Sequence, residues 1–274
     1  PCTLSVARWR DSGLLKPIDT SRVPRWNEIP SDMLGAKGIQ HDGKIWMMPF
    51  DWGNSTIIYR DDELPNAAQS YNLLLDPALR GRVSIFDSVD EAFVIAAGIL
   101  GYESHMELSD DEMQKCAEVL RELHKNIRFY WGDPTALQQS IAAGEILAAW
   151  AWTDSYISLR WEEVPVKFMF PTEGLSTWMC GFVLNADGPG DENLAYEYLN
   201  ATLDPNVGKV LIDEWGYGHA NAQSYKISES DLAKELGLTD DLTKFLKGTR
   251  FQGEIVPEKR EKMIEIFETV KLGG

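Results

Sequence analysis

The sequence has few cysteines and no long apolar run, and each shortage excludes a class of protein. The three cysteines, Cys2, Cys116 and Cys180, are widely spaced, and no Cys-x-x-Cys or His-x-x-x-His pair occurs. This pattern indicates neither a disulfide framework nor a zinc site, so buried or idle thiols are expected. No apolar run approaches the roughly 20 residues of a membrane span. No signal peptide is visible, and a start at Pro1 without Met indicates a processed or trimmed product.

Basic residues are also scarce, with 26 Lys and Arg against 43 Asp and Glu, which gives a net charge of −17. Nucleic-acid binding needs a basic patch, so this balance argues against it. The acidity suits a soluble secreted or periplasmic protein. Catalytic motifs are missing as well: there is no Gly-x-Ser-x-Gly elbow and no glycine-rich phosphate loop, and the four histidines stand apart.

A chain of 274 residues is long for a single hydrophobic core and suits two lobes of an α/β protein. Apolar periodicity, caps and turn residues predict strands and helices in alternation, which favours parallel α/β units. The predicted strands are Ile45–Pro49, Ser55–Arg60, Arg82–Phe86, Ile127–Tyr130, Ile146–Trp152, Val166–Phe170 and Gly181–Asn185. The predicted helices are Leu4–Gly13, Ser70–Leu75, Asp90–Leu100, Ser109–Lys125, Thr135–Ala143, Ser155–Glu162, Asp191–Leu203, Pro205–Trp215, Ser230–Glu235, Asp240–Leu246 and Pro257–Val270.

Three tryptophans stand beside short polar or acidic residues where an apolar strand is expected to end. They are Trp52 in Asp51-Trp52-Gly53-Asn54-Ser55, Trp152 before Thr153-Asp154, and Trp178 after Thr177. Side chains at strand ends face clefts in α/β proteins. An indole attracts an organic ammonium and a carboxylate neutralises it, so the pattern predicts a small-molecule binding cleft.

A series of short motifs, in a fixed order over most of the chain, resembles one protein family. The motifs are Ile29-Pro30-Ser31-Asp32-Met33-Leu34, Pro49-Phe50-Asp51-Trp52-Gly53, Leu75-Asp76-Pro77 with Arg80-Gly81-Arg82-Val83, Leu100-Gly101-Tyr102, Gly144-Glu145-Ile146, Pro171-Thr172-Glu173-Gly174 and Glu214-Trp215-Gly216-Tyr217. Single pieces are weak signals, but their order is similar to that of the periplasmic spermidine/putrescine-binding proteins.

The resemblance implies a bilobed periplasmic binding protein of type II, with two mixed sheets flanked by helices and hinged by strand crossovers. Lobe 1 would comprise residues 1–52 and 178–225, and lobe 2 residues 53–177 and 226–274. Such proteins capture substrate for a membrane ABC permease in the periplasm, with no catalysis and no cofactor. The ligand binds the closed state better and shifts the population toward it.

One departure from the family is large, because its members begin with a strand–helix–strand unit that is missing before Pro1-Cys2-Thr3. Either lobe 1 is incomplete or a second chain supplies the missing strands. A strand edge exposed by such a loss would invite pairing with another molecule.

The resemblance also implies the ligand residues. Trp52, Trp152, Trp178 and, less directly, Trp131 match aromatic cleft positions or lie beside them. Glu91 matches a carboxylate that holds an amine, and Gln252 matches an amide that contacts the ligand. Asp154 has no such counterpart, but it directly follows the Trp152 strand. We expect it to hold the ligand ammonium; the alternative is an N-cap of the helix at 155–162.

Two family acids are replaced in this chain, by Ser88 and by Cys180. A buried diamine needs a carboxylate at each end, since an unpaired buried charge costs several kcal/mol. One end of the ligand would then not be cationic. A zwitterion such as γ-aminobutyrate fits, with its ammonium on Asp154 and its carboxylate on Arg128, Ser55 or Ser88. A polyamine such as putrescine stays the alternative ligand.

Two other functions compete with import. A carbohydrate-active enzyme would use paired carboxylates with Trp platforms. A sensor module of the same fold would present its closed form to a membrane receptor, and the fold alone does not separate sensing from transport.

Overall fold

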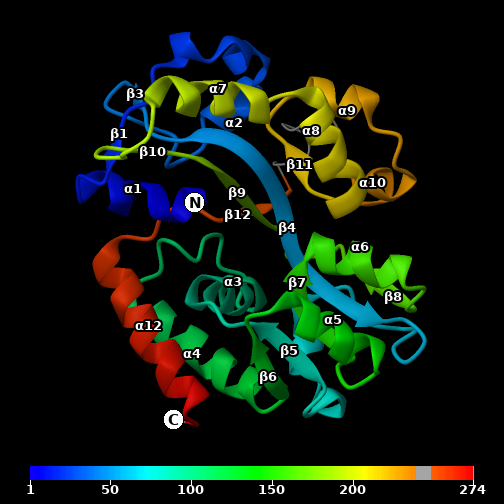
Figure 1. The fold of residues 1–274 in the computed structure, drawn as a ribbon. Helices are drawn as coiled ribbons and strands as arrows, with labels where there is room; N and C mark the ends of the chain where they lie inside the picture. Colours follow the sequence, from blue (N-terminus) through cyan, green and yellow to red (C-terminus); the bar gives the residue numbers. More distant parts are fainter. Residues whose placement is uncertain (239–247, 274) are drawn as a thin grey trace. The chain divides into compact units, whose positions relative to one another are not determined.

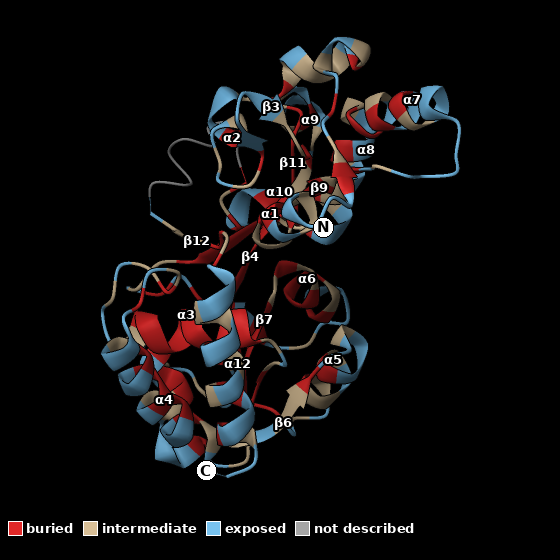
Figure 2. Cartoon of the chain, turned by 90° about the vertical axis from the view of Figure 1, so that its left-hand side faces the viewer, coloured by how far each residue is buried: buried red, intermediate tan, exposed pale blue. Residues whose placement is uncertain are grey.

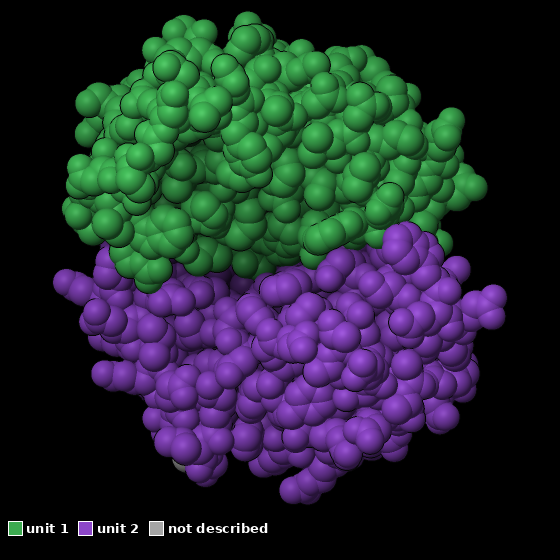
Figure 3. Space-filling model, in the orientation of Figure 1, with its two compact units in different colours: residues 1–53, 177–254 green, residues 54–176, 255–274 purple. Residues whose placement is uncertain are grey.

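The computed structural model describes residues 1–238 and 248–273, which divide into two compact units. Unit 1 comprises residues 1–53 and 177–254, and unit 2 comprises residues 54–176 and 255–274 (Figure 3). The chain therefore crosses between units at 53/54, 176/177 and 254/255. Two of these crossings fall within strands, β4 (Met48–Arg60) and β9 (Ser176–Phe182).

Unit 2 is built on a mixed sheet. From the second half of β4 the strand order continues through β7 (Ala148–Trp152) and β5 (Val83–Phe86) to β6 (Ile127–Trp131). Strand β5 runs parallel to β6 and β7, whereas β4 pairs antiparallel with β7 and with β8 (Val166–Phe168). The register Ser55↔Trp152 and Ile57↔Trp150 fixes β7 on β4. Because β5, β6 and β7 are parallel, their carboxyl ends lie at one edge of this sheet.

Helices cover both faces of this sheet (Figure 1). Helices α3 (Val89–Ile99), α4 (Asp110–His124) and α12 (Pro257–Lys271) contact one another, and α5 (Pro134–Ala142) contacts α6 (Thr153–Trp161). Ser109 and Glu112 form a capping box at the start of α4, where the sequence predicts a helix from Ser109. Helix α3 is buried almost throughout, in agreement with its nearly unbroken apolar sequence (Figure 2). The short helices η3 (Tyr71–Leu75) and η4 (Pro77–Leu79) complete unit 2.

Unit 1 surrounds the first half of β4, which lies beside β9 in the sheet order. The strand β11 (Gly218–His219) pairs with β4 on Trp52 and Asp51, and β12 (Arg250–Phe251) lies beside β9. The remaining described elements of unit 1 are α1 (Thr3–Asp11), β1 (Leu15–Lys16), η1 (Thr20–Arg22), η2 (Pro24–Glu28), α2 (Ser31–Leu34), β2 (Gln40–His41), β3 (Lys44–Ile45), β10 (Leu184–Asn185), α7 (Glu192–Thr202), α8 (Pro205–Val210), η5 (Leu211–Trp215), α9 (Gln223–Ile227) and α10 (Asp231–Glu235).

By their contacts, residues 226–238 and 248–254 belong to unit 1, whereas the resemblance places them in lobe 2. Helix α9 packs on α8 and α10 packs on η5. Near the end of the segment the backbone N–H of Gln252 donates to the carbonyl of Thr177, and the hydroxyl of Thr3 donates to the carbonyl of Gln252. Only the final helix, α12, returns to unit 2. The predicted helix Asp240–Leu246 lies outside the described residues.

The expectation of idle thiols is wrong for two of the three cysteines. Cys2 and Cys180 form a disulfide and also an antiparallel backbone bridge, while Cys116 is a buried free thiol in α4. The two half-cystines are 178 residues apart in sequence, so spacing could not reveal the pair. Pairing of the segment at Cys2 with β9 brings them together.

Candidate functional site

Three aromatic residues end the three parallel strands of unit 2, Phe86 on β5, Trp131 on β6 and Trp152 on β7. Their ring centroids lie 4.6 Å apart for Phe86–Trp131 and 4.9 Å apart for both Phe86–Trp152 and Trp131–Trp152. The carboxyl edge of parallel strands is where α/β proteins bind small ligands. We call Phe86, Trp131 and Trp152 the aromatic triad.

Within the triad the three rings are not equally accessible. Trp131 is 2% exposed, and its Nε1 donates to the carbonyl of Trp150 at 2.9 Å, so it is fixed in the core. Trp152 and Phe86 are only partly buried. Trp131 is therefore a fixed packing partner of Trp152. Phe86 is not among the residues predicted from the sequence, although an aromatic residue at the end of a buried strand was a usable signal.

Two predicted polar residues lie at the starts of helices that follow triad strands. Asp154 is in the first turn of α6, and Ser88 is the N-cap of α3 with no side-chain capping hydrogen bond. The alternative interpretation of Asp154 as an N-cap is wrong, because the N-cap is Trp152 and the helix begins at Thr153. A carboxylate in a first helical turn is stabilised by the helix dipole, and here it directly follows a triad tryptophan.

Glu91 is a buried carboxylate, 4% exposed, within the first turn of α3. Its Oε1 accepts a hydrogen bond from Ser55 Oγ at 2.8 Å and its Oε2 accepts one from Trp150 Nε1 at 2.7 Å. The Trp150 ring in turn packs edge-on against Tyr71, with centroids 4.8 Å apart. Glu91 therefore connects α3 to β4 and β7, and Ser55 is already engaged by it.

Arg128 does not lie with the triad, which corrects its expected role as a carboxylate partner. It follows Ile127 at the start of β6, whereas Trp131 ends the same strand. Its guanidinium pairs with Glu145 at 3.2 Å, and both side chains are about half exposed, at 48% and 49%. The sequence pattern could not show that Arg128 and the triad lie at opposite ends of the sheet.

In unit 1, Trp52 differs from its expected position at a strand end, because it lies inside β4 and is 1% exposed. Its Nε1 donates to Tyr225 Oη at 2.9 Å, and Tyr225 Oη also exchanges hydrogen bonds with the backbone of His219. The indole lies over Gly218, where a Cβ would overlap the ring. These contacts are those of a core tryptophan.

Trp178 also lies inside a strand, β9, and is 9% exposed. Its benzo ring covers Gly53, where a Cβ would come within 2.5 Å of Cζ2. Tyr217 packs against its other side edge-on, with centroids 4.9 Å apart. The Trp178 Nε1 atom is buried and has no hydrogen-bond acceptor among the described residues. Tyr217 was not predicted from the sequence as a neighbour of Trp178.

The remaining predicted residues of unit 1 are Gln252 and Cys180. Gln252 is 4% exposed and follows β12, with its backbone bonded to Thr177 next to Trp178. Cys180 forms the disulfide with Cys2, so this position carries neither an acidic group nor a free thiol. Beside Trp52, burial raises the pKa of the Asp51 carboxyl to about 6.

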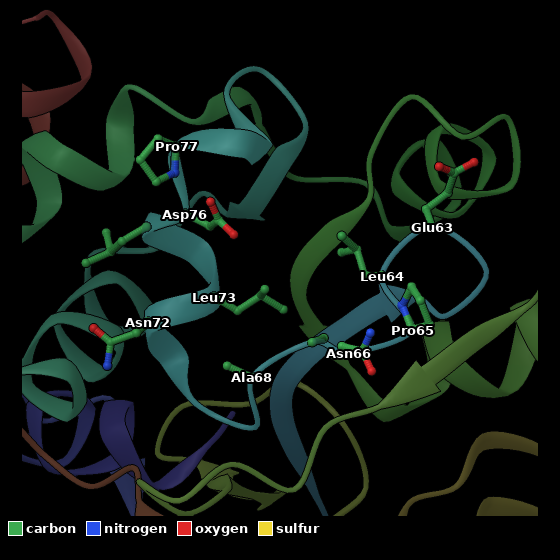
Figure 4. Close-up of a pocket in the computed structure, with 11 residues that line it drawn as sticks. Glu63, Leu64, Pro65, Asn66, Ala68, Asn72, Leu73, Asp76 and Pro77 are labelled. Atoms are coloured by element: carbon green, nitrogen blue, oxygen red, sulfur yellow. The ribbon is translucent and has the colours of Figure 1, made fainter.

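A separate surface cavity of about 570 Å³ lies in unit 2 and is lined only by residues between Glu63 and Pro77. Leu64 and Leu73 point toward one another across it (Figure 4). It contains none of the predicted ligand residues, and Asp76 uses its side chain to cap η4. Residues 1–238 and 248–273 contain no group of three side chains suited to hold a metal ion. No helix among those residues is long and apolar enough to cross a membrane.

Comparison with known proteins gives a family match over most of the chain. The family model for bacterial extracellular solute-binding proteins matches residues 3–236. The spermidine/putrescine-binding periplasmic protein of Salmonella typhimurium is 24% identical over 249 residues, which are 90% of this chain and 70% of that protein. The putrescine-binding periplasmic protein PotF of Escherichia coli is 25% identical over 255 residues, 87% of this chain and 68% of that protein.

Among solved structures, a putative spermidine/putrescine ABC transporter from Listeria monocytogenes superimposes with a TM-score of 0.87 at 19% identity. The match covers 99% of this chain and 82% of that one. This likeness confirms the expected fold class, the α/β fold of type II periplasmic binding proteins.

Proposed function

Because the chain belongs to the family of bacterial extracellular solute-binding proteins, we propose that it is the capturing subunit of an ABC importer for a small amine. The ligand would be a polyamine such as putrescine or a zwitterion such as γ-aminobutyrate. The protein would act in the periplasm and deliver its ligand to a membrane permease. The names of its relatives support the amine and the compartment.

The aromatic triad carries this proposal. Trp152 is a partly buried indole at the carboxyl edge of parallel strands, and it packs against Trp131 and Phe86. A rigid indole face is suited to the methylenes and the ammonium of an amine, and a cation on an indole gains about 0.5–2 kcal/mol.

Asp154 would supply the counter-charge for the ammonium. It is two residues beyond Trp152, in the first turn of α6. Unit 1 would add contacts from Trp178, while Ser88 and Gln252 would orient polar ligand groups. Glu91 and Ser55 would then stabilise β7 and would not contact the ligand directly, since Ser55 already donates a hydrogen bond to Glu91.

Ligand-dependent stabilisation of the full chain and of Asp154→Asn would test the proposal. We expect an amine to raise the Tm of the wild-type protein. Asp154→Asn should bind the amine at least about tenfold more weakly than the wild type, because a hydrogen bond to a charged group is lost. The control is Glu162→Gln, which removes an exposed carboxylate at the other end of α6. Equal affinities of Asp154→Asn and wild type would remove Asp154 from the site.

A further inference from the structure

The indole N–H of Trp178 is a buried hydrogen-bond donor for which the described residues provide no acceptor. The side chain is 9% exposed, and Nε1 is buried without an acceptor among residues 1–238 and 248–273. Buried tryptophan N–H groups normally find an acceptor, and leaving one unpaired is unfavourable. The three other buried indoles follow the rule: Trp52 donates to Tyr225, Trp131 to the Trp150 carbonyl and Trp150 to Glu91.

Packing prevents the Trp178 ring from turning toward an acceptor within unit 1. Its benzo ring lies against the backbone at Gly53, where even a Cβ would come within 2.5 Å. Tyr217 abuts it edge-on at 4.9 Å between centroids. The N–H is therefore held in one direction before any ligand binds, which is the arrangement of a preorganised donor.

We propose that Trp178 Nε1 donates to an acceptor oxygen of the ligand, so that the preferred ligand carries a carboxylate or carbonyl oxygen in addition to its ammonium. The inference rests on the proposed function and narrows its ligand class. An ammonium has three donors and no acceptor, so a diamine places donor against donor at this position. A ligand carboxylate can accept the hydrogen bond from Trp178 Nε1. Because it is an anion, it needs no acidic residue of the protein as its partner.

This assignment also fits the position of Cys180. A carboxylate there would repel a ligand carboxylate, whereas the disulfide of Cys180 with Cys2 presents no charge. Cys180 is two residues from Trp178 on β9, so the two side chains leave the strand on the same face. Unit 1 therefore offers a donor and a neutral neighbour on one strand face.

Calorimetry with three ligands of similar length tests the inference on the full chain: γ-aminobutyrate, 4-aminobutanamide and putrescine. At position 178, benzothienylalanine replaces the N–H by sulfur while keeping the ring size, and Trp178→Phe serves as a second variant. Trp46→Phe is the control, because Trp46 is also in unit 1 but its Nε1 already donates to the His41 carbonyl at 3.3 Å.

We expect the wild type to bind both oxygen-bearing ligands at least about tenfold more tightly than putrescine. Replacing the N–H should remove that preference, while Trp46→Phe keeps both the preference and the wild-type affinities. Tighter binding of putrescine by the wild type, or a preference that survives the sulfur isostere, would overturn the inference and leave the proposed function standing. If none of the three amines binds the wild type, the proposed function itself is refuted.

Discussion

Glu91 offers a sharp test of how unit 2 holds together. The carboxylate accepts from Ser55 Oγ at 2.8 Å and from Trp150 Nε1 at 2.7 Å, and all three residues are at most 4% exposed. In Glu91→Ala both donors lose this acceptor, and the buried Trp150 N–H alone costs about 1–3 kcal/mol when unpaired. Lost packing adds about 1–2 kcal/mol. We therefore expect a destabilisation of about 2–5 kcal/mol.

Glu91→Gln is the matched control, because it keeps the shape and one acceptor. Its amide oxygen can accept from Trp150, while its NH₂ group donates to the Ser55 hydroxyl, which rotates to accept. Only the charge-assisted part of each bond is lost, so the cost should be about 1–2 kcal/mol.

Urea unfolding of both variants, with hydrogen exchange of the α3 amides to report on unit 2, measures these costs. The reasoning fails if Glu91→Ala loses less than about 1 kcal/mol, or if Glu91→Gln is as damaging as Glu91→Ala. A variant Glu91→Gln that folds but no longer binds any amine would return Glu91 to direct ligand contact.

Three further predictions concern unit 1. Gly218→Ala should destabilise the protein by about 1–3 kcal/mol, seen as a lower Tm, because the new Cβ overlaps the Trp52 ring; an unchanged Tm would show that the ring can move. Cys2→Ser, or dithiothreitol on the wild type, should cost about 2–5 kcal/mol by releasing the bond to Cys180, and dithiothreitol should not affect the variant further. The folded-state pKa of Asp51, about 6, is above its ordinary 3.8, so its penalty on stability grows as pH rises from 3.8 and is complete above about 6. Asp51→Asn should then be more stable than wild type by up to about 3 kcal/mol at pH 7, and the difference should disappear below about pH 4 in urea titrations.

The sequence predicted local structure well wherever the signal was local. The capping box Ser109–Glu112 begins α4, and the apolar run before Thr153 forms β7. Ordered motifs along the chain identified the family, and the fold followed from it. Segments that depend on distant partners were predicted less well: Trp52 and Trp178 were expected at strand ends but lie within β4 and β9.

Residue types alone determined that this chain is an α/β protein with indoles and acids suited to an amine, because periodicity, caps and side-chain chemistry are properties of neighbouring residues. Only the tertiary structure decided which indoles have free donors, since hydrogen-bond partners such as Tyr225 for Trp52 are 173 residues away. It also decided that Arg128 lies apart from the triad and that Cys2 meets Cys180. Strand pairing joins residues across the chain, and no local pattern records which strands will pair.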